Sequence, residues 1–455
     1  MNDKAIESEF EHRLRAWYRR ETDAVLPAPA QLRDKVAAIP ESTIRTVGPL
    51  SHRRTLTLVA AALMATSIGG ILITGGMATP SPTPVLPSLP AAVGADLAWR
   101  SVSPMSVGRI GHTATLLRDG RVLVVGGYSA SAEIWDPRTG TFTMTGSMAH
   151  LRTNHAAALM SDGRVLVVGG NSGGNLTGDF TREVEVWDPA TGTFSVVGSL
   201  PVRRGPYVSA TRLLDGRVLV AGGVDCPSNL AAPTDDPCAG VDLRATVLFD
   251  PATDSLSPGP HLNDDRVAGT AVALLDGRVF FIGTAGYHRP AIAEVLDPVS
   301  GHVESVGTTT GRLAGGMHAT RLDDGRVLVT GPWWEPENNG GAELWDPTTG
   351  QFTRTEPSAS SRGGIEAVGL HDGRVLVIGV DPATDNIIHA PATEVWDQVS
   401  GTWAPGPAMG QARIGFTLTV LADGAVLALG GVDAMYEDRP TPIDSAELLA
   451  PSAAN

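Results

Sequence analysis

The sequence predicts an all-β protein: a seven-bladed β-propeller closed by an N-terminal strand and preceded by a transmembrane helix and a short helical cytoplasmic segment. Three observations predict this arrangement. The segment Asp-Gly-Arg-Val-Leu-Val, or a near copy, recurs seven times; an uncharged run precedes the first copy; and the last copy lacks a strand whose pattern occurs ahead of the first. The 455 residues accordingly divide into a cytoplasmic segment, a transmembrane helix, a Pro-rich linker and the propeller, at 1–54, 55–77, 78–94 and 95–451.

The cytoplasmic segment is predicted to contain short amphipathic helices. A capping-box pattern at Ser8 to Glu11 precedes Phe10, Leu14 and Trp17, which share one helical face, and a second helix is expected over residues 29–39. Two interpretations remain open: the segment docks on a partner or on the inner leaflet, or it is a loose tail that only sets topology. The arrangement resembles the cytoplasmic ends of membrane-anchored anti-sigma factors, without the Cys and His cluster of their zinc motif. This resemblance implies a transmembrane regulator as one alternative function.

The membrane prediction comes from residues 55–95, which contain no charge. Their first part, Leu56 to Met77, is long enough to cross a bilayer as a helix. His52, Arg53 and Arg54 precede it directly, so the positive-inside bias places the N-terminus in the cytoplasm and the propeller outside. A cleaved signal peptide is the rival interpretation, but the 54 residues before the apolar core are too many for the n-region of an ordinary signal peptide. The prolines of residues 79–90 predict a semi-rigid stalk.

Charge and cysteine content narrow the possible partners. Residues 1–54 hold 10 of the 34 basic and 8 of the 49 acidic groups, so the rest of the chain holds 24 and 41 and carries a net charge of −17. Such a body repels phosphate backbones, which argues against nucleic-acid binding. The only two cysteines, Cys226 and Cys238, have no His or Cys neighbours that would suit zinc. They are expected to form one local disulfide in an oxidising compartment.

Each repeat predicts one four-stranded blade. An alternating segment, here called strand A, leads through an Asp-Gly turn into strand B, and Asp-Gly between two such runs is typical of a tight hairpin. Strand C ends in Trp-Asp or a similar pair, and strand D carries one aromatic or apolar residue. The seven turns start at Asp119, Asp162, Asp215, Asp276, Asp324, Asp372 and Asp423.

Strand D is found only six times after a strand C. The missing copy is expected at the other end of the propeller, since the residues around Trp99 resemble those around Trp403. A strand from residues 97–105 would complete the blade that begins at Arg413 and leave no exposed edge.

The Gly-Gly pairs after strand B, such as Gly126-Gly127 and Gly430-Gly431, together with the strand-C and strand-D aromatics, resemble Kelch repeats. The Asp-Gly-Arg-Val-Leu-Val-Val-Gly-Gly form is similar to the Kelch propeller of galactose oxidase and its relatives. That resemblance covers residues 96–450 and implies the fold. It also raises a carbohydrate-active oxidase as an alternative function. The copper ligands of that family include a Tyr-His pair at the start of a strand A, whereas Tyr287-His288 follows a strand B. We therefore expect no catalytic residues, no metal and no cofactor. His112, His155 and His318 are interpreted as structural, and joint binding of a metal by the three is the alternative.

An arginine precedes every strand A, mostly ten residues before the Asp-Gly turn. One interpretation is structural: each pairs with a strand-C glutamate such as Glu133, Glu343 or Glu394, or with loop carbonyls. The other is an anion-binding ring at one mouth of the central channel. The seven are Arg109, Arg152, Arg204, Arg266, Arg312, Arg362 and Arg413.

Loop lengths indicate the binding face. The A–B turns are nearly identical, whereas the B–C loops vary, and binding residues concentrate on variable loops held by a rigid frame. One of these loops carries Trp333, Trp334 and Glu335, a Trp pair that the repeat pattern does not explain. The pair is either buried between blades or presented for stacking on a sugar ring or an apolar side chain. The sequence thus predicts a membrane-anchored, non-catalytic binding or sensing module for a protein or glycan ligand.

Overall fold

The computed structural model describes ten stretches of the propeller region, and all regular structure in them is β-strand. These residues contain no helix that is long and apolar enough to cross a membrane. The expectations for residues 1–94 lie outside the described part. The described stretches are 97–172, 180–223, 244–264, 268–284, 290–312, 317–331, 342–356, 363–380, 392–433 and 441–451.

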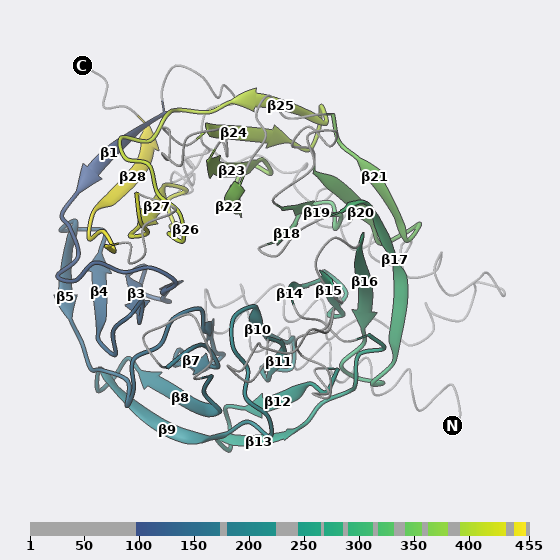
Figure 1. Ribbon diagram of the computed structural model, residues 1–455, viewed down its shortest axis with the longest axis horizontal. Coiled ribbons are helices and arrows are strands. Elements are labelled where there is room, and N and C mark those ends of the chain that lie inside the picture. The colour runs from purple at the N-terminus through teal and green to yellow at the C-terminus, as the bar shows by residue number, and fades with distance from the viewer. Residues whose placement is uncertain are drawn as a thin grey trace, which may run out of the picture. The chain divides into compact units, whose positions relative to one another are not determined.

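Seven separate four-stranded antiparallel sheets form the blades, as the repeat predicts. They are arranged in a ring with strand A of each blade innermost (Figure 1). The A strands are β2 (Thr113–Leu116), β6 (Ala156–Leu159), β10 (Val208–Arg212), β14 (Ala268–Ala273), β18 (His318–Arg321), β22 (Gly363–Gly369) and β26 (Thr417–Val420). The B strands are β3 (Val122–Val125), β7 (Val165–Val168), β11 (Val218–Gly222), β15 (Val279–Thr284), β19 (Val327–Thr330), β23 (Val375–Val380) and β27 (Val426–Leu429).

The C strands lie third from the centre and the D strands form the outer rim (Figure 1). The C strands are β4 (Ala132–Asp136), β8 (Glu183–Asp188), β12 (Val247–Asp250), β16 (Pro290–Leu296), β20 (Glu343–Asp346), β24 (Ala392–Asp397) and β28 (Ala446–Pro451). The D strands are β5 (Thr141–Met144), β9 (Thr193–Ser199), β13 (Ser255–Pro258), β17 (Val303–Arg312), β21 (Gln351–Arg354), β25 (Thr402–Pro405) and β1 (Leu97–Val102). Blades are numbered 1 to 7 from the blade of β2 to the blade of β26.

The core lies between blades rather than in one central mass. Both faces of each B strand pack on a neighbouring sheet, so strands such as β3, β7 and β27 are buried along their whole length. This explains why the B strands consist of continuous Val and Leu instead of alternating with polar residues. Trp135, Trp187, Trp345 and Trp396 of the C strands fill the spaces farther from the axis and are also buried.

The predicted closure is confirmed. β1 pairs antiparallel with β28 over six residues, from Leu97 opposite Pro451 to Val102 opposite Ala446. Beyond the strand, Met105 is buried in the cluster between blades 7 and 1, and its amide donates to Asp444 O at 2.8 Å. Trp99 is half-buried, and its indole Nε1 donates to Pro407 O at 3.1 Å. The two ends of the described propeller are thereby joined in one sheet.

The Asp-Gly turns of blades 3 and 4 lie close together. Gly277 has a φ of +87°, which favours glycine, and a Cβ there would lie 2.6 Å from Cδ1 of Leu214, which precedes the turn of blade 3. A side chain on Gly277 would therefore meet both a strained backbone and its neighbour. Leu214 is 62% exposed and lies beside this turn.

Candidate functional site

Wherever the structure describes their side chains, the arginines that precede strand A are buried inside the blades and have a structural role. Arg266 and Arg362 lie outside the described residues, and the side chain of Arg312 at the end of β17 is not described. The other four have no exposed surface: Arg109, Arg152, Arg204 and Arg413.

In blade 1 the guanidinium of Arg109 spans from strand A to strand C. Its Nη1 donates to Gly126 O at 2.5 Å and Ser131 O at 3.0 Å, and its Nη2 donates to Glu133 Oε1 at 2.8 Å. Neither partner of this ion pair is exposed. The pairing that the sequence predicts is thus present in this blade, and an anionic ligand would have to open it before meeting the arginine.

The same ion pair recurs in blades 2 and 7. Nη2 of Arg152 lies 2.6 Å from Glu185 Oε1, and Nη2 of Arg413 lies 2.8 Å from Glu447 Oε1. Burial lowers the pKa of Arg413, while the hydrogen bond and charge of Glu447 oppose that shift. A buried pair of this kind is destabilising when either partner is lost, because the other charge stays in a low-dielectric interior.

Each of these glutamates also holds the loop that enters its blade. The second carboxylate oxygen accepts a backbone amide from the preceding D–A loop: Ser106 N to Glu133 Oε2 at 2.8 Å, and Ala149 N to Glu185 Oε2 at 2.9 Å. In blade 7, Gly410 N donates to Glu447 Oε2 at 2.7 Å. The arginine–glutamate pairs therefore hold the D–A loops in place, which the sequence reasoning did not foresee.

Blade 3 departs from this pattern. Val247 stands on strand C where blade 1 has Glu133, and Arg204 donates instead to Gly222 O at 2.5 Å and to Ala245 O. The structural interpretation also allowed an arginine to pair with loop carbonyls, and Arg204 does so in blade 3.

Two of the three strand-A histidines, His112 and His155, are buried and form hydrogen bonds between neighbouring blades. His155 Nε2 lies 2.9 Å from Thr113 Oγ1 of blade 1, and His112 Nε2 lies 3.0 Å from Thr417 Oγ1 of blade 7. Burial, and then the nearby arginine charges, lower the pKa of His112 to about 3, and burial with the charge of Arg152 does the same for His155. Both imidazoles are therefore neutral at physiological pH, and each links two A strands around the axis.

His318 has a different place from these two. Counting back from the Asp-Gly turn, it occupies the position of Thr113, one residue after that of His112. We call the seven residues at this position the axial girdle: Thr113, Ala156, Ser209, Thr270, His318, Glu366 and Thr417. Nε2 of His318 lies 3.8 Å from Oε2 of Glu366, and their side chains are 29% and 25% exposed.

Glu366 is the acidic member of this girdle, and the sequence reasoning missed it. Burial raises the pKa of its carboxyl to about 8. At the junction with blade 7, the position that His112 and His155 occupy in their blades is held by Phe416, which cannot form the hydrogen bond. The signal in the sequence was a carboxylate at a position that is otherwise a small hydroxyl, alanine or His, and aligning the seven A strands on their turns would have found it.

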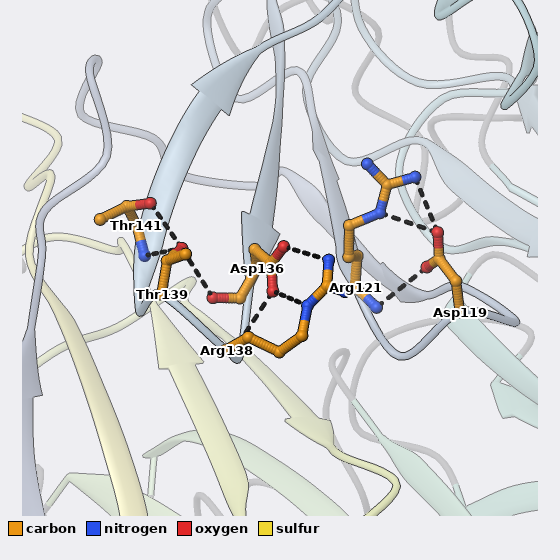
Figure 2. A network of polar contacts seen from close by, with 6 residues as sticks. All are labelled: Asp119, Arg121, Asp136, Arg138, Thr139 and Thr141. Atoms are coloured by element: carbon orange, nitrogen blue, oxygen red, sulfur yellow. Dashed lines mark hydrogen bonds and ion pairs between the residues drawn. The ribbon is translucent and has the colours of Figure 1, made fainter.

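The opposite face is uniform and has its charges paired. In the A–B turn of blade 1, Asp119 accepts from N and Nε of Arg121 at 3.1 and 2.8 Å, and in the C–D turn Asp136 accepts from Nε and Nη2 of Arg138 at 3.0 and 2.7 Å (Figure 2). Hydrogen bonds from Arg138 lower the pKa of Asp136 to about 2. The Asp–Arg pair of the A–B turn recurs in the next five blades, at Arg164, Arg217, Arg278, Arg326 and Arg374. This face thus presents a nearly repeating surface.

The remaining predicted site residues have no described position. Trp333, Trp334 and Glu335 lie outside the described residues, as do Cys226 and Cys238. Their roles stay predictions.

Comparison with known proteins places the chain in a broad class. A family model described as the Kelch motif matches residues 152–201, which form blade 2. Among solved structures, the chain is similar to one described as a novel fungal alcohol oxidase of the AA5 family in complex with copper. The TM-score is 0.58, the identity 17%, and the alignment covers 78% of this chain and 76% of the other. No curated protein sequence matches the chain.

These findings define a seven-bladed β-propeller that contains a Kelch motif. More particularly, its fold is similar to the galactose oxidase-like AA5 fold. At 17% identity the likeness is one of fold, and the same scaffold carries unrelated functions.

Proposed function

We propose that this protein is a membrane-anchored extracytoplasmic propeller that acts as a non-catalytic binding or sensing module for a protein or carbohydrate ligand. The observation that supports this most is the contrast between the two ends of the blades. One end carries near-identical Asp-Gly turns with paired charges, while the B–C loops at the other end vary in length and sequence. A rigid frame with variable loops is the usual construction of a recognition surface.

Within that face, the Trp pair is the stronger candidate for ligand contact. Arg109, Arg152, Arg204 and Arg413 are fully buried and bonded inside their blades, so their charge serves the frame. Trp333 and Trp334 stand on a B–C loop outside the repeat pattern, with Glu335 beside them. An aromatic pair next to a carboxylate suits stacking on a sugar ring, with the acid accepting hydrogen bonds from its hydroxyls.

The proposed location follows from the residues ahead of the propeller. The apolar run Leu56 to Met77, preceded by His52 to Arg54, supports one membrane crossing with the N-terminus inside.

A glycan array probed with the full-length protein tests the proposed function. Binding that Trp333→Ala/Trp334→Ala weakens at least tenfold supports it. The matched control is Val399→Ser, since Val399 is 91% exposed on a C–D turn of the opposite face and should alter neither folding nor binding. Equal binding by the Trp variant and the wild type would contradict the assignment of the Trp pair. A pull-down with extracytoplasmic proteins, compared between the same variants, covers a protein ligand.

The fold similarity favours one second candidate, an oxidase-like enzyme acting on extracellular carbohydrate. The described residues do not fit a copper centre of that kind. His112 and His155 are buried against threonine hydroxyls, and no cluster of three His, Cys, Asp or Glu occurs in the part of the chain that the structure describes. Tyr287-His288 lies outside that part. Stoichiometric copper in the purified protein, together with alcohol-dependent oxygen consumption, would favour the enzyme.

A further inference from the structure

The junction between blades 3 and 4 lacks a side chain that two other junctions have. In every A strand one residue directly precedes the axial girdle. In blades 1 and 2 this residue is a histidine, His112 or His155, whose ring bonds to the girdle threonine of the preceding blade. In blade 4 it is Gly269, and the girdle residue of the preceding blade is Ser209. This junction therefore keeps the hydroxyl but has no imidazole. The seven residues at this position are His112, His155, Val208, Gly269, Met317, Ile365 and Phe416.

The two junctions with an imidazole share a second wall. In both, the ring lies against the glycine at the end of strand B in the preceding blade. A Cβ on Gly126 would lie 2.7 Å from His155 Cε1, and a Cβ on Gly430 would lie 2.9 Å from His112 Cε1. The corresponding glycine of blade 3 is Gly222. Among the described residues beyond its chain neighbours, a Cβ there would approach within 4 Å only the carbonyl oxygen of Tyr207, in the same blade. No described atom of blade 4 covers this wall.

A cavity lies at this junction, where β10 and β14 are side by side at the inner edge of the ring (Figure 1). Ser209, Gly222 and Gly269 line it, and its empty volume of about 220 Å³ includes space that is open to solvent. Ser209 and Gly269 are half-buried, so the open side lies at the A strands. The enclosed part has room for about one water molecule, so a ring would enter it by one edge. The deep wall is apolar and buried, and consists of Leu262, Phe281 and Ile282.

The backbone of blade 4 explains why residue 269 is glycine. β14 begins at Ala268, so Gly269 belongs to the ladder and pairs with Gly283, whereas the A strands of blades 1 and 2 begin after their histidines. A Cβ on Gly269 would lie 2.9 Å from Ile282 O, which is closer than Cβ atoms approach a backbone oxygen. The longer ladder therefore requires glycine, and no side chain at position 269 fills the cavity.

We propose that this cavity binds a neutral imidazole ring between Ser209 and Gly222, as the junction of blades 1 and 2 holds the ring of His155. Ser209 Oγ donates to Ala221 O at 3.2 Å, so its lone pairs can accept the ring N–H. The ring carbons then contact the glycine and the apolar wall. The second ring nitrogen lies toward the open side, where water can bond to it.

The charge behind the cavity favours the neutral ring over imidazolium. The guanidinium of Arg204 is fully buried and donates to Gly222 O at 2.5 Å, so a positive charge lies directly behind the glycine wall. His112 and His155 have the same kind of neighbour, and burial together with the arginine charges lowers their pKa to about 3. The ring can come from a free imidazole compound or from a histidine side chain of a peptide. Because the site lies between A strands and not on the B–C loops, it goes beyond the proposed function and does not depend on the Trp pair.

A ligand-observed NMR titration of the full-length protein with imidazole tests the site. At pH 8.5 the free ring is neutral, and we expect saturable binding. Nα-acetyl-histidine methylamide is the second probe, and the probe that binds more tightly identifies the source of the ring. Oxazole is the matched control ligand, since it has the same ring shape without an N–H donor. It should bind severalfold more weakly than imidazole.

Variants of Ser209 make the result decisive. Ser209→Ala should weaken imidazole binding by roughly threefold to tenfold, the contribution of one neutral hydrogen bond, and should bind imidazole and oxazole equally. Ser209→Leu fills the cavity and should abolish binding. Thr113→Ala removes the equivalent hydroxyl from a junction that already holds an imidazole, and should leave binding unchanged. Trp333→Ala/Trp334→Ala should also leave it unchanged, which separates this site from the proposed recognition surface.

A thermal melt of each variant checks folding, and Ser209→Ala decides the test if Ser209→Leu does not fold. Three results would each overturn the proposal. The first is equal imidazole binding by Ser209→Ala and the wild type. The second is equal binding of oxazole and imidazole by the wild type. The third is the lack of saturable binding of either imidazole probe, which would mean that the cavity holds only water.

Discussion

Removing the N-terminal strand should open the ring of blades. A chain lacking residues 97–105 loses β1 and Met105, and exposes the edge of β28. Met105 is 2% exposed, and truncating a buried methionine costs about 2–5 kcal/mol. Trp99 is half-buried, so it contributes about half of the 3–5 kcal/mol of a fully buried Trp.

The lost ladder adds to this cost, since each backbone hydrogen bond contributes about 1 kcal/mol. The sum exceeds about 5 kcal/mol, comparable with the 5–15 kcal/mol that stabilises a typical domain. Chemical unfolding of the full-length protein and of the deletion variant, followed by Trp fluorescence, measures the difference. We expect the variant to lose its cooperative transition.

A point-mutant pair provides the matched control. Trp99 and Trp403 occupy the same strand-D position in blades 7 and 6, both half-buried, and the Trp403 Nε1 donates to Thr355 Oγ1 at 3.3 Å. If β1 serves blade 7 as β25 serves blade 6, Trp99→Ala and Trp403→Ala should each cost about 2 kcal/mol. A Trp99→Ala variant as stable as the wild type, beside a destabilised Trp403→Ala, would refute the reasoning about closure.

Three further predictions concern the disulfide, a buried histidine and a buried ion pair. Cys226 and Cys238 should be disulfide-bonded, and mass spectrometry after alkylation without reduction should find neither labelled; labelled thiols would contradict the pairing or the topology. His112 has a pKa of about 3 in the folded state and near 6.5 when unfolded, so its own contribution to stability should fall with pH below 6.5 by about 1.4 kcal/mol per unit; His155 should contribute equally, and the raised pKa of Glu366 opposes both. His112→Gln should reduce the loss between pH 7 and 5 in denaturant titrations, and an unchanged loss would argue against this role. Arg109→Ala should cost about 3–5 kcal/mol by leaving Glu133 buried and unpaired, and Arg109→Met/Glu133→Gln should cost less; equal stability of Arg109→Ala and the wild type would show that the pair is dispensable.

Local patterns in the sequence were sufficient to predict the four-stranded structure of each blade. Asp-Gly turns and alternating apolar residues act over a few positions, so the strand order within each blade could be predicted from them. The similarity between the residues around Trp99 and Trp403 was enough to predict closure. The pairing of Arg109 with Glu133 was also within reach, because both recur at fixed distances from the turn.

The contacts between blades were decided only by the tertiary structure. His112 meets Thr417 across 305 positions of the chain, and only the closed ring brings them together. The sequence offered His318 as one of three similar histidines, whereas the ring places it against Glu366 and apart from the buried pair. The raised pKa of Glu366 has the same origin: its burial is a property of the assembled ring, and no local pattern around residue 366 encodes which side chain the neighbouring blade presents to it.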